Sequence, residues 1–313
     1  MMGVGTALLW LLNGWHVHPD YTILEAIGQL MPGDTFPLFF EMEMFQRALF
    51  AALLVTIVAG FLGVYLLIQN LALIGDGLAH VSFGGVAVGI VLGATSPLWY
   101  ALVFSVTAAI LIHEMQSREM LTGDASIAIF LTGMLAFGLV ILRLGGGTIT
   151  TDIENYLFGS LLLIDKSDLD LIATICILSL ILLAALRYAL LASTIDPLAA
   201  RVQGLPVRGI GLLFSVMTAA VVVSMVQVVG TLLVTALLVT PAATAQLISR
   251  SFRSCIIITQ FFGLCSVMIG LYLSSELDTG SGSMIALVAA SIFALVAIIQ
   301  VVTRTLVKPE VNM

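Results

Sequence analysis

Long apolar runs dominate this chain and restrict what it can fold into. A transmembrane helix needs about 20 mostly apolar residues to cross a hydrocarbon core of roughly 30 Å, and several runs reach that length. Only 9% of the residues are charged, against about 25% in a typical soluble domain. A transmembrane β-barrel would instead show alternating segments of about 10 residues. The sequence therefore predicts an all-α, polytopic membrane protein with about eight or nine transmembrane helices.

The apolar runs follow one another at short intervals. We expect crossing helices at 48–68, 72–92, 97–113, 125–143, 169–191, 209–228, 230–248, 254–274 and 283–303. The stretch 209–248 is too long for one crossing at 1.5 Å per residue, so we divide it near Gly230. Pro241 is expected to kink the helix that contains it. The segment 155–164 is too short to cross, which predicts a re-entrant or interfacial segment.

Basic residues in the loops assign the two sides of the membrane, because cytoplasmic loops carry an excess of Lys and Arg. One predicted side holds Arg118, Arg187, Arg201, Arg208, Arg250, Arg253, Arg304 and Lys308. The other side holds Arg47, Arg143 and Lys166. The richer side is predicted to be cytoplasmic. The protein is therefore expected in the cell membrane. Its chain divides into an N-terminal extension of unknown role (1–45), a transmembrane domain (46–303) and a cytoplasmic tail (304–313).

Several functional classes are excluded or disfavoured by composition and motif. The net charge is −7 with few lysines, which argues against nucleic-acid binding. The three cysteines, Cys176, Cys255 and Cys265, show no CxxC spacing, so no disulfide framework or thiolate site is indicated. The sequence lacks GxxxxGK[ST], HExxH and GxSxG, so no nucleotide-binding loop or hydrolase motif is present. We expect His113 and Glu114 to begin a solvated loop.

One short stretch, GDGLAHVSFGG (75–85), places an aspartate and a histidine inside an apolar helix. Asp76 and His80 are spaced i, i+4 and therefore share a helix face. A carboxylate at this depth costs at least about 2–3 kcal/mol, and no Lys or Arg lies at comparable depth in the predicted helices. Three interpretations remain open at this point. The pair binds a divalent cation such as Zn²⁺ or Mn²⁺, relays protons in a secondary transporter, or serves packing, with Asp76 orienting the imidazole.

A second polar segment, STIDPLAARVQGLPVRG (193–209), predicts a short cytoplasmic helix. Asp196 is expected to cap it, Pro197 to occupy its first turn and Gly204 to end it. The segment is too polar to cross the membrane. It is therefore expected to lie on the membrane or to dock onto a cytoplasmic partner.

Glycines at helical spacing predict close contacts between the crossing helices. Gly85, Gly89 and Gly93 recur every fourth residue, and Gly60 and Gly63 lie in the first predicted helix. Small residues allow helix backbones to approach one another in lipid.

The order of these blocks resembles a known family, the permease subunits of zinc and manganese ABC importers. The resemblance runs from about Phe45 to Val302 and rests on MFQRALFAALLVTIVAGFLGVYLL, ALIGDGLAHVSFGGVAVG, YLFGSLL, DPLAARVQGL and LLVTPAATA. It implies an ABC importer permease fold, a transported zinc or manganese ion and no permanently bound cofactor. The residues in these blocks are slightly closer to those of the zinc members.

The resemblance also implies partners and site residues. It implies a second permease copy, a cytoplasmic ABC ATPase that hydrolyses the ATP, and an extracytoplasmic metal-binding protein. Asp76 and His80 match the family's metal-contacting pair, and one copy supplies only two ligands. Met134, Asp152 and Glu154 are further candidates by position and chemistry. The helix at 193–207, with Asp196, Pro197, Ala200 and Gly204, matches the coupling helix that docks in the ATPase. The alternative is a proton-coupled secondary metal transporter with Asp76 and His80 as the relay.

Overall fold

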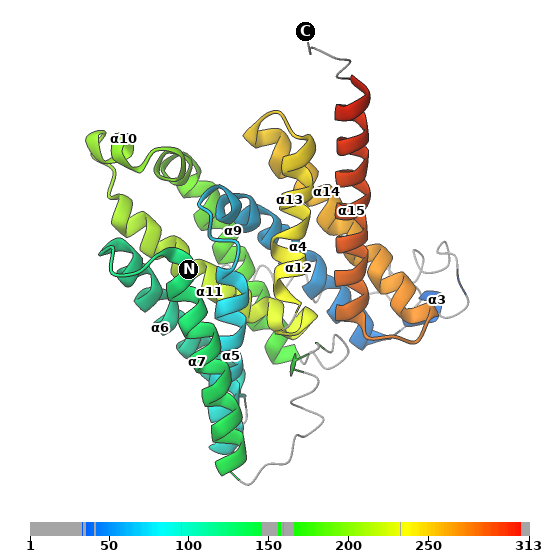
Figure 1. The fold of residues 1–313 in the computed structure, drawn as a ribbon. Coiled ribbons are helices and arrows are strands. Elements are labelled where there is room, and N and C mark those ends of the chain that lie inside the picture. Colours follow the sequence, from blue (N-terminus) through cyan, green and yellow to red (C-terminus); the bar gives the residue numbers. More distant parts are fainter. Residues whose placement is uncertain are drawn as a thin grey trace, which may run out of the picture.

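Eight helices long and apolar enough to cross a membrane make up most of the part of the chain that the structure describes (Figure 1). The computed structural model describes residues 33, 36–40, 42–94, 96–145, 156–157, 159, 166–231 and 233–307, and within these ranges it contains no strand. The long helices are α4 (Glu43–Ile68), α5 (Ile74–Val91), α6 (Leu98–Ser117), α7 (Gly123–Leu144), α9 (Lys166–Ile195), α11 (Val207–Val229), α14 (Phe252–Glu276) and α15 (Ser281–Val307). The predicted all-α membrane fold is confirmed.

The predicted crossing helix at 230–248 is interrupted: this stretch forms two short helices, which lead the chain from the end of α11 back to the start of α14. α12 (Val234–Leu238) and α13 (Thr240–Ile248) meet at Val239. The break falls just before Pro241, whose ring lacks an N–H donor and opposes the carbonyl four residues earlier. The division near Gly230 is confirmed, since α11 ends at Val229 and Gly230 adopts a φ of 86°.

α5 is the most enclosed of the crossing helices and contacts α6, α7, α11 and α12. Glycines make this packing possible. A Cβ added at Gly85 would lie 2.6 Å from the carbonyl oxygen of Tyr100, and one added at Gly89 would lie 3.0 Å from Cα of Pro97. The prediction fails for Gly93, which has open space around it and a φ of 68°. Gly93 instead terminates α5, where Ala94 N–H donates to Gly89 O at 2.9 Å.

α5 and α7 run parallel to one another. Gly77 faces Ile127, and Gly84, seven residues further along α5, faces Met134, seven residues further along α7. Parallel neighbours require that the intervening α6 returns the chain to the end where α5 began. The sequence order of the crossings predicts this arrangement.

Hydrogen bonds between distant segments define the two ends of the bundle. At one end, Gln69 Nε2 donates to Thr194 Oγ1 at 2.9 Å. At the other, the Phe36 N–H donates to Glu276 Oε1 at 2.9 Å. Figure 1 shows that α10 (Pro197–Val202) and the last turns of α15 lie at the first of these ends. Arg201 of α10 and Arg208 of α11 (Val207–Val229) lie at this end, and its assignment to the cytoplasm stays a prediction.

A short helix, α3 (Phe36–Phe39), lies within the predicted N-terminal extension. Phe36 and Phe40 are fully buried, and the Phe36 ring packs edge-on against Phe45 of α4 and Tyr272 of α14. Residues 36–40 are therefore packed onto the crossing helices. Residues 1–32, the greater part of the predicted extension, and residues 308–313 of the predicted tail lie outside the described residues.

Candidate functional site

Asp76 and His80 lie in the first two turns of α5, with their side chains on one face of the helix. Nε2 of His80 is 3.8 Å from Oδ1 of Asp76. This separation exceeds hydrogen-bonding distance. The imidazole is 8% exposed, whereas the Asp76 side chain is 28% exposed. The pair thus combines an enclosed nitrogen donor with a carboxylate that remains accessible.

The second ring nitrogen of His80 is also without a partner. Nδ1 is buried and forms no hydrogen bond in the described part of the chain. A buried polar atom without a partner is costly and uncommon, and a functional role or a bound ion is one explanation for it. A packing role would require a hydrogen bond from His80 to Asp76 or to a neighbouring helix, and the described residues show neither.

The other predicted site residues differ in where the structure places them. The Met134 side chain lies over Gly84, since a Cβ there would be 2.9 Å from Met134 Cε, and Gly84 is one helical turn beyond His80. Asp152 and Glu154 lie outside the described residues. No cluster of three or more His, Cys, Asp or Glu side chains suited to a metal occurs in the described ranges. Asp76 and His80 are therefore two potential ligands and not a complete set.

The predicted short helix is α10, and its local geometry confirms the sequence reasoning. Asp196 Oδ1 accepts hydrogen bonds from the N–H groups of Leu198 at 3.0 Å and Ala199 at 2.9 Å, and Pro197 is the first helical residue. Gly204 ends the helix with a φ of 83°, and Leu205 N–H donates to Ala200 O at 3.0 Å. These contacts satisfy backbone groups at both helix ends.

The exposed side chains of α10 were missed by the sequence reasoning. Ala200 is 1% exposed and faces the protein, whereas Leu198 and Val202 are 72% and 90% exposed. Their i, i+4 spacing places both on one face, away from Ala200. Two apolar residues at this spacing in an otherwise polar segment were the signal that would have identified them.

A second omission is Tyr156, in the YLFG stretch. It packs against a cluster formed by Phe83 and Ala87 of α5, further along that helix than His80, and Leu142 of α7. Its carbonyl accepts a hydrogen bond from the N–H of Thr231 at 3.2 Å, directly after the end of α11. Burial raises the pKa of the Tyr156 hydroxyl. The segment around Tyr156 therefore links α5 to the break between α11 and α12.

The expectation that His113 and Glu114 begin a solvated loop is wrong. Both lie in the last two turns of α6. Glu114 forms ion pairs with Arg118 and with Arg208 of α11. The helix extends past the apolar run because these polar contacts continue its packing onto α11.

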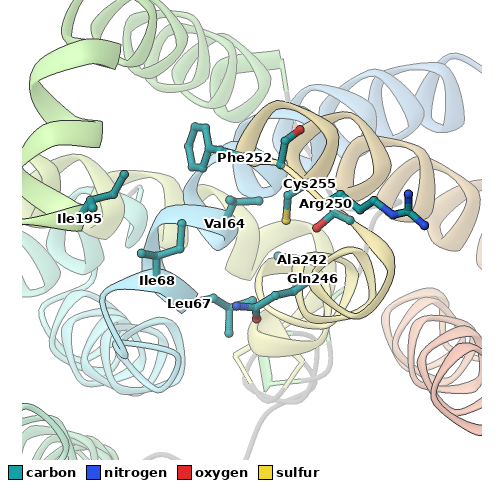
Figure 2. Close-up of a pocket in the computed structure, with 11 residues that line it drawn as sticks. Val64, Leu67, Ile68, Ile195, Ala242, Gln246, Arg250, Phe252 and Cys255 are labelled. Carbon is teal, nitrogen blue, oxygen red and sulfur yellow. The ribbon is translucent and has the colours of Figure 1, made fainter. Parts of the chain in front are cut away.

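A cavity of about 300 Å³ lies at the same end of the bundle as α10. Figure 2 shows Val64 and Ile68 of α4, Ile195 at the end of α9, Ala242 of α13 and Phe252 of α14 around it, and the Arg250 side chain points away from them. Asp76 and His80 do not line this cavity. It is largely apolar and marks looser packing between α9 and the α13–α14 turn.

Comparison with known proteins agrees with the architecture. The model of the ABC 3 transport family matches residues 41–300. The manganese transport system membrane protein MntC of Halalkalibacterium halodurans is 34% identical over 250 residues, covering 80% of this chain and 85% of that protein. The manganese import system permease protein ScaB of Streptococcus gordonii is 30% identical over 253 residues, covering 81% and 90%.

Solved structures give the same result. PsaBC from Streptococcus pneumoniae in complex with Fab contains a chain 32% identical to this one, with a TM-score of 0.72, covering 82% of this chain and 91% of that one. An inward-facing putative metal-chelate type ABC transporter has a TM-score of 0.70 at 16% identity over 93% of this chain and 99% of that one, and so shares the fold alone. Because the family model covers most of its length, the chain belongs to the ABC 3 transport family.

Proposed function

We propose that this chain is the permease subunit of an ATP-driven importer of manganese, and that Asp76 and His80 contact the ion as it crosses. The observation that carries this proposal is the Asp76–His80 pair itself. It combines a carboxylate oxygen with an enclosed imidazole whose Nδ1 lacks a hydrogen-bond partner in the described part of the chain.

The spacing of the pair suits a shared ion. Carboxylate oxygen and imidazole nitrogen bind such divalent metals at about 2.0–2.2 Å, so two ligands of one ion stand at most roughly 4.4 Å apart. The separation of 3.8 Å between His80 Nε2 and Asp76 Oδ1 falls within this limit. The carboxylate of Asp76 supplies negative charge and an oxygen ligand, and the imidazole of His80 supplies a nitrogen ligand.

Relatives favour manganese over zinc as the transported ion. The residues of the sequence blocks are slightly closer to those of zinc members, but MntC and ScaB are both named for manganese. Sites rich in carboxylate and water oxygens suit Mn²⁺, and the thioether of Met134 is a poor ligand for it. We therefore assign Met134 to packing against Gly84. Water, a second permease copy or further oxygen ligands complete the coordination shell.

The remaining components follow from what this chain lacks. Its sequence has no nucleotide-binding loop, so ATP hydrolysis belongs to a separate cytoplasmic ABC ATPase. α10 is the docking element for that subunit, with Leu198 and Val202 as its apolar contacts. An extracytoplasmic metal-binding protein delivers the ion to the opposite end. Binding and hydrolysis of ATP then alternate access to Asp76 and His80 between the two sides of the membrane.

The test is uptake of radiolabelled Mn²⁺ and Zn²⁺ in cells expressing this chain with its ATPase partner. We expect uptake of labelled Mn²⁺ that an excess of unlabelled Zn²⁺ does not suppress. An ATPase-inactive partner should abolish this uptake. Uptake of Zn²⁺ instead would reassign the ion. Uptake that continues without ATPase activity would reject the importer and favour the proton-coupled alternative.

A further inference from the structure

Glu114, near the end of α6, joins two helices that are far apart in the sequence. Its Oε1 accepts a hydrogen bond from Nη2 of Arg208, at the start of α11, and another from Nε of Arg118 at 2.6 Å. The Glu114 side chain is 33% exposed, whereas the guanidinium-bearing side chains are 64% exposed at Arg118 and 61% exposed at Arg208. Of the two pairs, the one with Arg208 crosses between helices, and the one with Arg118 stays within a single turn.

His113 strengthens the same junction. Its Nε2 donates to the carbonyl oxygen of Arg208 at 3.2 Å. One turn along α11, a Cβ added at Gly211 would lie 2.6 Å from Cε1 of His113. The first turn of α11 is therefore held against α6 by the side chain and the backbone of Arg208 together.

α10 is connected to this junction by a short, closed turn. α10 ends at Val202, and α11 begins at Val207. Within the turn, Leu205 N–H donates to Ala200 O at 3.0 Å and Val207 N–H donates to Leu205 O at 2.8 Å. Pro206 further restricts the backbone. The turn is therefore rigid, and a displacement of α10 also displaces Arg208.

The other side of α10 adjoins the end of α9. Ile195, which precedes the cap of α10, lines the cavity of about 300 Å³ between α4, α9, α13 and α14 (Figure 2). The end of α9 borders this cavity and is held by the hydrogen bond between Thr194 and Gln69. Movement of α10 therefore has a second route, through α11 and α6, besides the one through α9.

α6 in turn is packed directly on α5. Ser105 Oγ of α6 donates to the carbonyl oxygen of Leu78 at 3.3 Å, two residues before His80. Gly85 of α5 lies against the backbone of Tyr100. A shift of α6 therefore reaches the part of α5 that carries Asp76 and His80.

From these contacts we infer that Glu114 is a positioning residue, which passes the movement of α10 through α6 to the Asp76–His80 pair. The inference rests on the proposed transport function. Exposed ion pairs contribute little to folding stability. Loss of the Glu114–Arg208 pair is therefore expected to alter coupling while the fold and the assembly of the complex persist.

The experiment measures Mn²⁺ uptake and ATP hydrolysis in the same proteoliposomes, with the full complex of permease, ATPase and metal-binding protein. In Glu114→Ala, Mn²⁺ transported per ATP hydrolysed is expected to fall by about twofold to thirtyfold, the range found for mutations between coupled sites. Arg208→Ala removes the same pair from α11 and is expected to give the same loss. The double variant is expected to be no worse than either single variant. Arg118→Ala, which leaves the interhelical pair intact, is the matched control and should keep the wild-type ratio.

Three results would overturn the inference: a wild-type ratio in Glu114→Ala, an equal loss in Arg118→Ala, or additive losses in the double variant. Mn²⁺ uptake by the wild-type complex distinguishes failure of this inference from failure of the proposed function. If the wild-type complex hydrolyses ATP but transports no Mn²⁺, both are rejected. If it transports Mn²⁺ and Glu114→Ala keeps the same ratio, the inference alone is rejected.

Discussion

For His80 and Asp76, sequence spacing predicts the shared helix face, but only the folded structure shows the surroundings of each side chain. The i, i+4 pattern placed both side chains on one face of α5, and the structure agrees. Their different exposure and the lack of a partner for His80 Nδ1 were not predictable, because they depend on helices that are distant in the sequence. Tyr156 and Gly159 give a similar case, since their contacts with α5 and α11 arise only in the folded chain.

Gly159 is expected to be intolerant of a side chain. Its φ is 79°, and a Cβ there would lie 2.5 Å from the carbonyl carbon of Val229. Gly159→Ala should lower stability by at least about 1–2 kcal/mol from the left-handed backbone alone. Thermal unfolding of the detergent-solubilised protein measures this. Gly133→Ala, in α7 with open space around it, is the control and should not lower the melting temperature. Equal melting temperatures for Gly159→Ala and wild type would contradict the packing of this segment.

The cap at Asp196 makes a second prediction at this scale. Asp196→Ala removes the acceptor for the N–H groups of Leu198 and Ala199, at a cost of about 1 kcal/mol. Amide hydrogen exchange at these two positions should quicken about fivefold. Asp196→Asn keeps an acceptor oxygen and should exchange like wild type. Unchanged exchange in Asp196→Ala would show that α10 does not depend on this cap.

Among the helices, composition and length predicted which segments cross the membrane better than they predicted where each helix begins and ends. Eight of the expected crossings are present because a long apolar run has no other stable arrangement in lipid. The ninth, at 230–248, is divided into α12 and α13, because Gly230 separates it from α11 and the break at Val239 falls just before Pro241. α6 extends to Ser117, beyond the predicted end, because Glu114 finds a partner on α11 that the sequence of α6 does not reveal.

The exposed face of α10 predicts where a cytoplasmic subunit docks. Leu198→Glu and Val202→Glu should reduce co-purification of the ATPase by at least about tenfold, because a charge replaces apolar contact area at the centre of the interface. Leu277→Glu, which alters an exposed leucine at the opposite end of the bundle, is the control and should leave co-purification unchanged. Normal co-purification of both α10 variants would remove this helix from the docking surface.

At the scale of the whole molecule, polar chemistry lies at two places joined by packed helices. Asp76 and His80 lie on α5, the most enclosed crossing helix, and α10 lies at the end of the bundle where Gln69 contacts Thr194. The sequence predicted both places, because polar residues stand out in a chain with so few charges. It did not predict the connection between them through Arg208, Glu114 and α6, which depends on contacts 94 residues apart.

The most direct test of the account is ATP-driven uptake of radiolabelled Mn²⁺ into proteoliposomes that contain the complete complex. Asp76→Ala and His80→Ala should each lower uptake at least about tenfold, since ligand geometry and affinity depend on both groups. Asp124→Ala, which removes an exposed carboxylate from the first turn of the parallel helix α7, should transport like wild type. Uptake near the wild-type rate in both Asp76→Ala and His80→Ala would contradict the assignment of the ion's path to this pair.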